Sequence, residues 1–163
     1  MDEKTNVGAP KRAASRLAQS RDTLSSKELG DLGELAFVLA ATAKGLPVAK
    51  PFGDCRRYDL IVDSGRRLLR IQVKSAFTTS RWGYSVAVAR NRLGRRAERY
   101  SAEEIDFVVA YIVPHDAWYI VPVGEVVGRV HIRLYPEGTR KRGGGYFERY
   151  REAWELLRVP GSR

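Results

Sequence analysis

Four polar residues in the first half of the chain have the types and the spacing that a metal-dependent hydrolytic site needs: Glu34, Asp59, Gln72 and Lys74. Carboxylates are the oxygen ligands that hard cations such as Mg²⁺ or Mn²⁺ prefer. The side-chain oxygen of Gln72 and the main-chain carbonyl of Val73 would complete the protein ligands. Lys74 would orient or help to deprotonate an attacking water, or stabilise the charge that builds on a phosphorus atom. The sequence therefore predicts a catalytic site in which the first three residues and Val73 bind the metal.

Ordinary structural roles are the alternative for the same residues. Glu34 could pair with a nearby arginine, and Asp59 could close the edge of a hairpin. Gln72 and Lys74 could lie on a solvated strand face, and a Gln-x-Lys sequence alone is common. Charged residues are, however, rarely buried unless they are paired or bind a ligand. An acid within an apolar stretch that packs on a strand carrying lysine therefore favours a site.

The acid Glu34 lies in a predicted helix. Ser25 and Glu28 have the spacing of a capping box, which starts a helix, and Gly45 is a helix-ending residue. We therefore expect a helix from Ser25 to just before Gly45. Residues 35–43 are apolar on every side of this helix, which predicts that it is buried all round.

A hairpin follows and positions the other residues. The segments 58–63 and 68–76 have the composition of strands and are joined by a four-residue turn. A turn of that length pairs positions whose numbers sum to 131, so Asp59 faces Gln72. Side chains alternate along a strand, so Lys74 lies on the same face as Gln72. Packing the helix on this sheet brings the helical carboxylate to the same place.

Further strands are expected at 84–90, 106–113 and 117–121, and an amphipathic helix at 146–157. The pattern predicts an α/β fold with a mixed central sheet flanked by helices.

The length of 163 residues fits one domain. We expect a disordered basic arm at 1–24, the folded domain at 25–157, and a short tail at 158–163.

Charge and composition narrow the classes of partner. The 29 Lys and Arg outnumber the 19 Asp and Glu, for a net charge of +10, which favours a polyanion. The single cysteine, Cys55, excludes an internal disulfide, and two histidines, His115 and His131, leave little for histidine chemistry. No apolar run approaches the roughly 20 residues of a membrane span. A cytoplasmic protein without a membrane partner is expected.

Arginines near the predicted site are candidates for contacts with nucleic-acid phosphates, which the guanidinium binds in a bidentate manner. A solvated surface is the alternative for any one of them. The candidates are Arg56, Arg57, Arg66, Arg67, Arg70, Arg81, Arg90, Arg92, Arg95 and Arg96.

The pair Gly33-Glu34, the segment 58–63 and the segment 71–74 together resemble the PD-(D/E)XK nuclease superfamily. The resemblance covers about residues 25–122. It is strongest to small bacterial members and to intron-encoded homing endonucleases, and archaeal Holliday-junction resolvases share the same layout. It implies a restriction-endonuclease-like core.

The resemblance also implies roles for single residues. Glu34 matches the helix carboxylate, Asp59 the metal ligand, and Lys74 the lysine of the motif. Two positions depart from the pattern, because Tyr58 precedes Asp59 where proline is usual, and Gln72 replaces the usual acid. The net charge of Glu34, Asp59 and Lys74 is therefore −1, whereas a third acid would make it −2. The smaller charge lowers repulsion in the empty site and weakens its attraction for Mg²⁺.

The function expected on these grounds is that of a Mg²⁺- or Mn²⁺-dependent endonuclease that hydrolyses phosphodiester bonds in DNA, like a homing endonuclease or a junction resolvase. A non-catalytic nucleic-acid-binding module with the same fold is the alternative, and a nuclease acting on RNA is a third. Cutting both strands with one site per chain favours a homodimer or a higher homo-oligomer.

Overall fold

The structure of the chain is a computed structural model that describes residues 19–53, 56–90, 97–138 and 145–158. Most of the predicted arm and tail, 1–18 and 159–163, lies outside these ranges. The described part begins with a short 3₁₀ helix, η1(Ser20–Asp22), which leads into the first long helix. Among the described residues, no helix combines the length and the apolar composition that crossing a bilayer requires.

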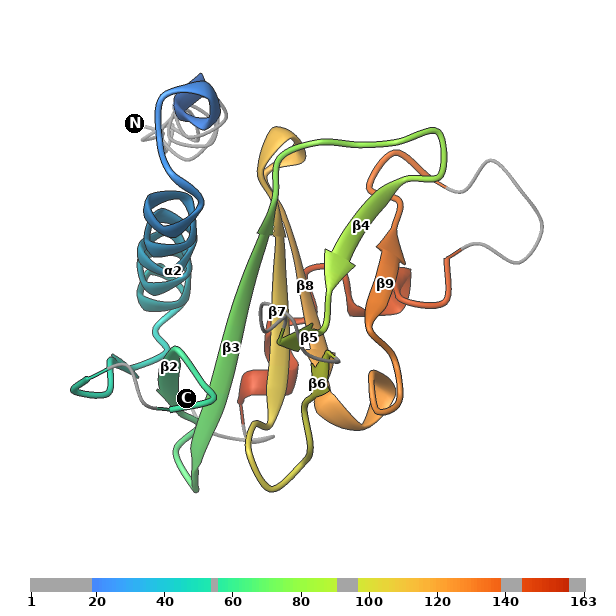
Figure 1. The fold of residues 1–163 in the computed structure, drawn as a ribbon. Helices are drawn as coiled ribbons and strands as arrows, with labels where there is room; N and C mark the ends of the chain where they lie inside the picture. Colours follow the sequence, from blue (N-terminus) through green and yellow to red (C-terminus); the bar gives the residue numbers. More distant parts are fainter. Residues whose placement is uncertain (1–18, 54–55, 91–96, 139–144, 159–163) are drawn as a thin grey trace, which may run out of the picture.

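A five-stranded mixed sheet forms the centre of the fold (Figure 1). Its first three strands are antiparallel, the third and fourth are parallel, and the last pair is antiparallel again. The strand order is β1-β2-β3-β7-β8, with the bounds β1(Val48–Ala49), β2(Leu60–Asp63), β3(Leu68–Ala76), β7(Phe107–Ile112) and β8(Ala117–Pro122). The predicted α/β fold with a mixed central sheet is confirmed.

The helix α2(Ser26–Ala43) packs along β3 on one face of this sheet (Figure 1). Ser25 and Glu28 form the predicted capping box, with the Ser25 N–H donating to the Glu28 carboxylate at 2.8 Å. The prediction that the helix is buried all round is wrong, because Leu35 and Leu39 are 62% and 67% exposed. A helix lying on a single sheet buries only one stripe of side chains.

Two apolar cores lie on the two faces of the sheet. The first joins Phe37 of α2 to Trp118 of β8 and to Trp154 near the end of the described chain, with the Phe37 and Trp154 ring centroids 5.7 Å apart. The second lies under a smaller two-stranded sheet of β4(Tyr84–Ala87) and β9(His131–Leu134). Both faces of β7 and β8 are therefore buried, which explains their nearly continuous apolar sequences.

The predicted strand at 84–90 is divided and does not join the main sheet. Its first part, β4, pairs with β9, and its second part, β5(Ala89–Arg90), pairs with β6(Glu98–Arg99). Between them, the Val88 N–H donates to the Val130 carbonyl at 2.8 Å. Two short 3₁₀ helices, η2(Val113–His115) and η3(Val123–Glu125), follow β7 and β8.

The predicted helix at 146–157 is wrong. The segment forms two 3₁₀ helices, η4(Glu148–Tyr150) and η5(Trp154–Leu157), separated by Glu152 with a φ of 52°. The Glu152 carboxylate accepts hydrogen bonds from the Trp118 N–H and the Trp154 indole N–H, each at 2.8 Å. These contacts with β8 outweigh the local helical pattern. Within the described residues, β4, β9 and Phe147 pack on the second sheet face, and no α-helix lies there.

Candidate active site

The site is built on an edge of β3 that β2 leaves open. The two strands pair from Asp63 and Leu68 to Leu60 and Ile71, in the predicted register. Beyond that point β2 gives way to Asp59, whose N–H still donates to the Ile71 carbonyl at 2.9 Å. Backbone groups two residues apart on a strand face the same edge, so the N–H and the carbonyl of the next such residue, Val73, face this opening.

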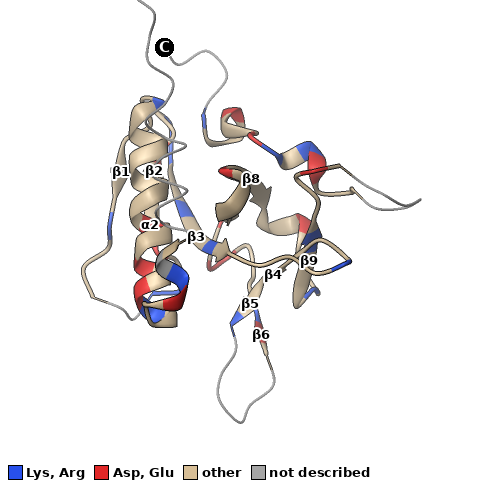
Figure 2. Cartoon of the chain, turned by 90° about the horizontal axis from the view of Figure 1, so that it is seen from above, with Lys and Arg blue, Asp and Glu red and all other residues tan. Residues whose placement is uncertain are grey.

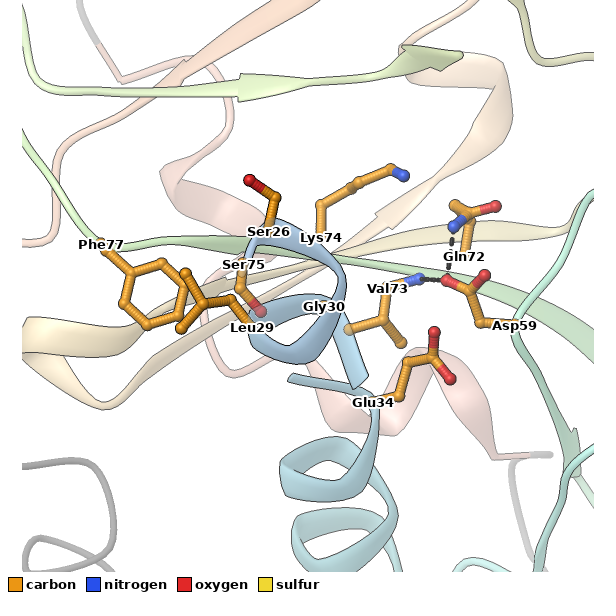
Figure 3. A pocket seen from close by; sticks show the side chains of 10 residues that line it. All are labelled: Ser26, Leu29, Gly30, Glu34, Asp59, Gln72, Val73, Lys74, Ser75 and Phe77. Carbon is orange, nitrogen blue, oxygen red and sulfur yellow. Dashed lines mark hydrogen bonds between the residues drawn. The ribbon is translucent and has the colours of Figure 1, made fainter. Parts of the chain in front are cut away.

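The Asp59 carboxylate closes part of the open edge. Its Oδ2 atom accepts a hydrogen bond from the Val73 N–H at 2.8 Å and another from the Gln72 side-chain nitrogen (Figure 3). The Gln72 amide therefore presents its nitrogen to Asp59, and its oxygen is turned away from that carboxylate. The predicted pairing of Asp59 with Gln72 is confirmed.

Side chains from both faces of β3 meet at this edge. Val73 lies on the face that α2 covers, and Glu34 reaches the pocket from that helix. Gln72 and Lys74 extend from the opposite face of the strand (Figure 3). The sequence pattern gave the alternation along β3, and the structure shows that the helix lies on the face without Gln72 and Lys74.

One pocket of about 390 Å³ contains all the predicted catalytic and metal-binding residues. Glu34, Asp59, Gln72, Val73 and Lys74 line one half of it. The other half is lined by residues of the first turns of α2 and the end of β3, namely Ser26, Leu29, Gly30, Ser75 and Phe77. Figure 3 shows these two halves side by side.

Burial perturbs the charged groups of the pocket. It raises the pKa of Asp59, and the nearby Glu34 charge adds to this, against the Val73 N–H, the Lys74 charge and the Gln72 amide. Burial lowers the pKa of Lys74, and the Arg90 charge also lowers it, against the attraction of Asp59 and Glu34. Each group is thus less easily charged than it is in water. A bound cation would favour the charged form of Asp59, and a bound phosphate would favour the charged form of Lys74.

Glu34 has a cationic partner at the pocket rim. The Lys50 ammonium nitrogen lies 2.8 Å from Glu34 Oε2, and the side chain of Lys50 is 63% exposed. The hydrogen bond to Glu34 is the main cause that raises the pKa of Lys50. Lys50 could not be identified from the sequence, because it lies 16 residues from Glu34 and outside every motif.

The donor set fits a magnesium-like cation. Among the described residues, no group of three or more His, Cys, Asp or Glu side chains is placed to hold a metal ion, so a cation in the pocket would have to be held by fewer protein carboxylates. Mg²⁺ usually keeps several waters and is bound through one or two carboxylates. Glu34 and Asp59, together with the Val73 carbonyl at the open edge, meet that requirement.

Comparison with known proteins agrees with this geometry. The model of the PD-(D/E)XK endonuclease family matches residues 24–156. The chain belongs to this family. A solved structure of a bacterial homing endonuclease, I-Ssp6803I, is similar over 82% of this chain and 93% of its own, with 34% identity and a TM-score of 0.73. No curated protein matches the chain. The predicted family, the fold and the function of a DNA endonuclease are thereby confirmed.

The arginines of this PD-(D/E)XK endonuclease fall into distinct groups, and its Lys and Arg residues are spread over several elements (Figure 2). Three candidates form ion pairs within the chain, and in two of them the contact is short: Arg57 contacts Glu98 at 2.9 Å, and Arg70 contacts Asp106 at 3.0 Å. Arg67 lies 3.7 Å from the same Asp106. Of the other candidates, Arg56, Arg66, Arg81 and Arg90 are exposed, while Arg92, Arg95 and Arg96 lie outside the described residues.

The exposed arginines differ in where they lie relative to the pocket. Arg66 lies in the turn before β3, at the end of that strand remote from Lys74. Arg81 stacks over the Trp82 ring, 4.6 Å from its centroid, in the loop that leads from the pocket residue Phe77 to β4. The charge of Arg90 reaches Lys74.

Proposed function

We propose that this endonuclease cleaves DNA by metal-dependent hydrolysis, with Mg²⁺ or Mn²⁺ held by Glu34 and Asp59. The observation that carries the proposal is the Asp59 carboxylate, which the Val73 N–H fixes at the open edge of β3 in the same pocket as Glu34. When bound, the cation supplies positive charge to the scissile phosphate and lowers the pKa of a water molecule. The Val73 carbonyl is the third protein ligand in this proposal.

Lys74 is proposed as the catalytic cation of the chain itself. Its ammonium group is partly buried beside two carboxylates, and burial lowers its pKa. A phosphate entering the pocket would find this group already desolvated, which strengthens its attraction for the charge that develops on the phosphate oxygens. The same lowered pKa eases the transfer of a proton between Lys74 and the attacking water.

Gln72 is proposed to orient Asp59 and, by turning its amide, to offer the side-chain oxygen as a further ligand. In the structure its nitrogen donates to Asp59 Oδ2. That neutral donor holds the carboxylate without neutralising its charge, which an arginine in the same place would do. The departure from the usual acid is thus compatible with a charged, metal-ready Asp59.

The DNA-facing surface is proposed to centre on the exposed arginines near the pocket, Arg56, Arg81 and Arg90, with Arg92, Arg95 and Arg96. Arg57 and Arg70 make intramolecular ion pairs, so they are expected to contribute little direct contact with phosphates. The likeness to a homing endonuclease supports a DNA duplex as the substrate. Two copies of the chain are proposed to cut the two strands, since each chain supplies one pocket.

A plasmid-nicking assay tests the proposal. Chelator-treated protein is mixed with supercoiled DNA and titrated with Mg²⁺, Mn²⁺ or Ca²⁺, beside the variants Asp59→Asn and Lys74→Ala. Nicking should return with Mg²⁺ or Mn²⁺ for the wild type and for neither variant, while a gel shift shows that all three proteins still bind DNA. Nicking without any divalent cation contradicts the proposed metal. Binding without nicking under every condition, including branched DNA, supports the non-catalytic module instead, and preferential cleavage of RNA supports the third function.

A further inference from the structure

Helix α2 packs tightly against β3 at a buried glycine, Gly33. A Cβ atom built on Gly33 would lie 2.0 Å from the Ser75 Oγ atom and 3.3 Å from the Ser75 Cβ atom. Non-bonded carbon and oxygen atoms do not approach to 2.0 Å, so a side chain at Gly33 requires the helix or Ser75 to move. Rotation of the Ser75 hydroxyl relieves the first clash but not the approach to the Ser75 Cβ atom, so the close packing of α2 on β3 requires glycine at this position.

The glycine has no other evident reason to be there. Gly33 lies in the interior of α2, and its φ is not positive, so its backbone could be that of any residue. Glycine in a helix interior is less favourable than alanine. Gly30, one turn earlier on the same helix, offers a comparison, because a Cβ atom built there has nothing within 4 Å. Close packing is thus a requirement at Gly33 and not at Gly30.

Ser75 contributes the other half of the contact without gaining a hydrogen bond. Its hydroxyl oxygen is buried and has no hydrogen-bond partner among the described residues. A buried, unsatisfied hydroxyl is unfavourable, so Ser75→Ala, which removes the hydroxyl, is expected to be tolerated. The contact can therefore be altered from the strand side as well as from the helix side.

The close approach bears directly on the pocket because Glu34 is the next residue of the helix. Glu34 reaches the pocket from the face of β3 that α2 covers, whereas Lys74 extends from the opposite face. The Glu34 carboxylate must therefore reach past the edge of β3 to act together with Asp59. If the helix moved away from the strand, the Glu34 carboxylate would be withdrawn from that edge.

We propose that Gly33 is a positioning residue of the endonuclease: its contact with Ser75 seats α2 on β3 at the depth that brings Glu34 to Asp59. The inference rests on the proposed metal site, since it concerns the joint action of these two carboxylates. It assigns to Gly33 a role in the affinity for the cation, through the space that it leaves for Ser75, and none in the chemical step.

The test measures Mn²⁺ binding to the full chain without DNA, from the electron paramagnetic resonance signal of free Mn²⁺. Gly33→Ala should weaken the affinity about tenfold, the size typical of residues that orient metal ligands. Adding Ser75→Ala removes the closest contact and should restore part of the affinity. Adding Ser75→Gly instead also removes the contact at 3.3 Å and should restore more. Gly30→Ala is the matched control, and it and Ser75→Ala alone should bind Mn²⁺ like the wild type.

The outcomes separate this inference from the proposed function. If the wild type binds no Mn²⁺, or if Glu34→Gln and Asp59→Asn bind it equally well, the proposed metal site is wrong. If both carboxylates are required but Gly33→Ala binds like Gly30→Ala, the positioning role is overturned. A loss in Gly33→Ala that neither Ser75 substitution recovers overturns it too. Thermal unfolding is recorded for each protein, and if Gly33→Ala does not fold, the comparison is made between its two double variants, where equal affinities contradict the inference.

Discussion

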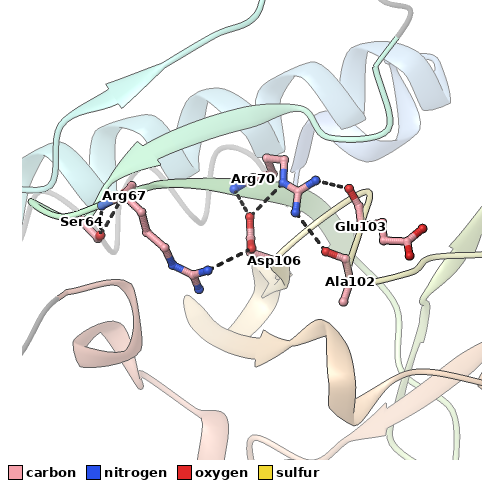
Figure 4. A network of polar contacts seen from close by, with 6 residues as sticks. All are labelled: Ser64, Arg67, Arg70, Ala102, Glu103 and Asp106. Atoms are coloured by element: carbon pink, nitrogen blue, oxygen red, sulfur yellow. Dashed lines mark hydrogen bonds and ion pairs between the residues drawn. The ribbon is translucent and has the colours of Figure 1, made fainter.

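Two aspartates bind opposite edges of the same strand, and only one of them lies in the pocket. Asp59 Oδ2 accepts from the Val73 N–H and from the Gln72 amide, and Asp106 Oδ2 accepts from the Arg70 N–H at 2.8 Å and from its Nε at 3.0 Å (Figures 3 and 4). The backbone contact is the same in both. The side-chain partner is a neutral amide in the pocket and a guanidinium at the other edge.

The difference in partner has an electrostatic consequence. Burial acts on both carboxylates and favours their protonated forms. At Asp59 burial prevails, and the pKa is raised. At Asp106 the hydrogen bonds and charge of Arg70, with the charge of Arg67, outweigh burial and lower the pKa. Asp106 is therefore a carboxylate that is paired with an arginine of the chain, whereas the two hydrogen-bond donors to Asp59 in the described structure are neutral amides.

The rest of the Arg70 network supports its structural role. The guanidinium also donates to the carbonyl of Ala102 at 3.0 Å and to that of Glu103 (Figure 4). It thus joins β3 to the turn that precedes β7. A backbone N–H bound to a carboxylate is thus common to both sites, and the side-chain partner distinguishes them.

The largest expected difference between the two aspartates is in cleavage. Asp59→Asn should reduce DNA nicking by at least about 10²-fold, because the pocket loses a ligand and its remaining charge falls to zero. Asp106→Asn should cleave at close to the wild-type rate and lose about 1–3 kcal/mol of unfolding free energy, because the charge-assisted hydrogen bond and the ion pair with Arg70 are lost. Nicking rates and urea unfolding of both variants measure this. Equal loss of activity in the two would remove the distinction between them.

Replacing the neutral partner of Asp59, Gln72, by an acid should increase the difference in cation binding between the Asp59 and Asp106 sites. Gln72→Glu places a third acid beside Asp59, so the charge of the pocket becomes more negative by one. We expect the Mn²⁺ affinity to rise about tenfold, since affinity depends on the number of charged ligands. The metal-free protein should be less stable, because the hydrogen bond to Asp59 is replaced by like charges. Calorimetric titration with Mn²⁺ measures the first effect, and an affinity below that of the wild type would show that the Gln72 amide itself is needed.

The pH dependence of stability should have opposite signs at the two sites. The raised pKa of Asp59 means that the folded state binds its proton more tightly, so this group lowers stability as pH rises through that pKa. The lowered pKa of Asp106 means that its contribution is present above the ordinary carboxyl range and is lost as pH falls. In metal-free protein at neutral pH, Asp59→Asn should therefore be more stable than the wild type and Asp106→Asn less stable.

Urea unfolding from about pH 3 to pH 7 tests this pair of signs. Both differences from the wild type should shrink toward the acidic end, where the carboxyl groups are protonated in the folded and unfolded states alike. A difference of the same sign for both variants at neutral pH contradicts the comparison.

The smallest expected effect concerns the exposed cation next to Glu34. Lys50→Met removes the ammonium group that lies 2.8 Å from this carboxylate. Because Lys50 and a divalent cation attract the same oxygen atoms, the Mn²⁺ affinity of the free protein should increase about twofold to fivefold, the range of a surface ion pair. Lys44→Met makes the same change of charge at the far end of α2, over the Trp154 ring, and should leave the affinity unchanged. A lower affinity in Lys50→Met would mean that Lys50 orients Glu34 for the metal.

The parts of the fold that the sequence predicts well are those fixed by nearby residues. The four-residue turn determines the register of β2 and β3, and this register places Asp59 beside Gln72. The capping box at Ser25 starts α2 as expected. The pocket could be predicted for the same reason, since two of its elements form one hairpin and the third is a helix that must cover a sheet.

The parts that were wrong depend on distant contacts. Glu152 leaves the helical conformation because Trp118, which lies 34 residues earlier, binds its carboxylate. The pairing of Arg70 with Asp106 spans 36 residues, so the sequence could not separate this arginine from those free to meet DNA. The exposure of the outer face of α2 could not be predicted, because an apolar composition does not show whether other elements pack on both sides of a helix.

A crystal structure with Mn²⁺ tests the central claim most directly, because anomalous scattering locates this ion without assumptions about activity. The account predicts an anomalous peak in the pocket at about 2.0–2.6 Å from carboxylate oxygens of both Glu34 and Asp59. The same crystals of Asp59→Asn should lack the peak, and those of Asp106→Asn should retain it. A peak that contacts only one of the two carboxylates, a peak elsewhere on the protein, or an unchanged peak in Asp59→Asn would contradict the claim.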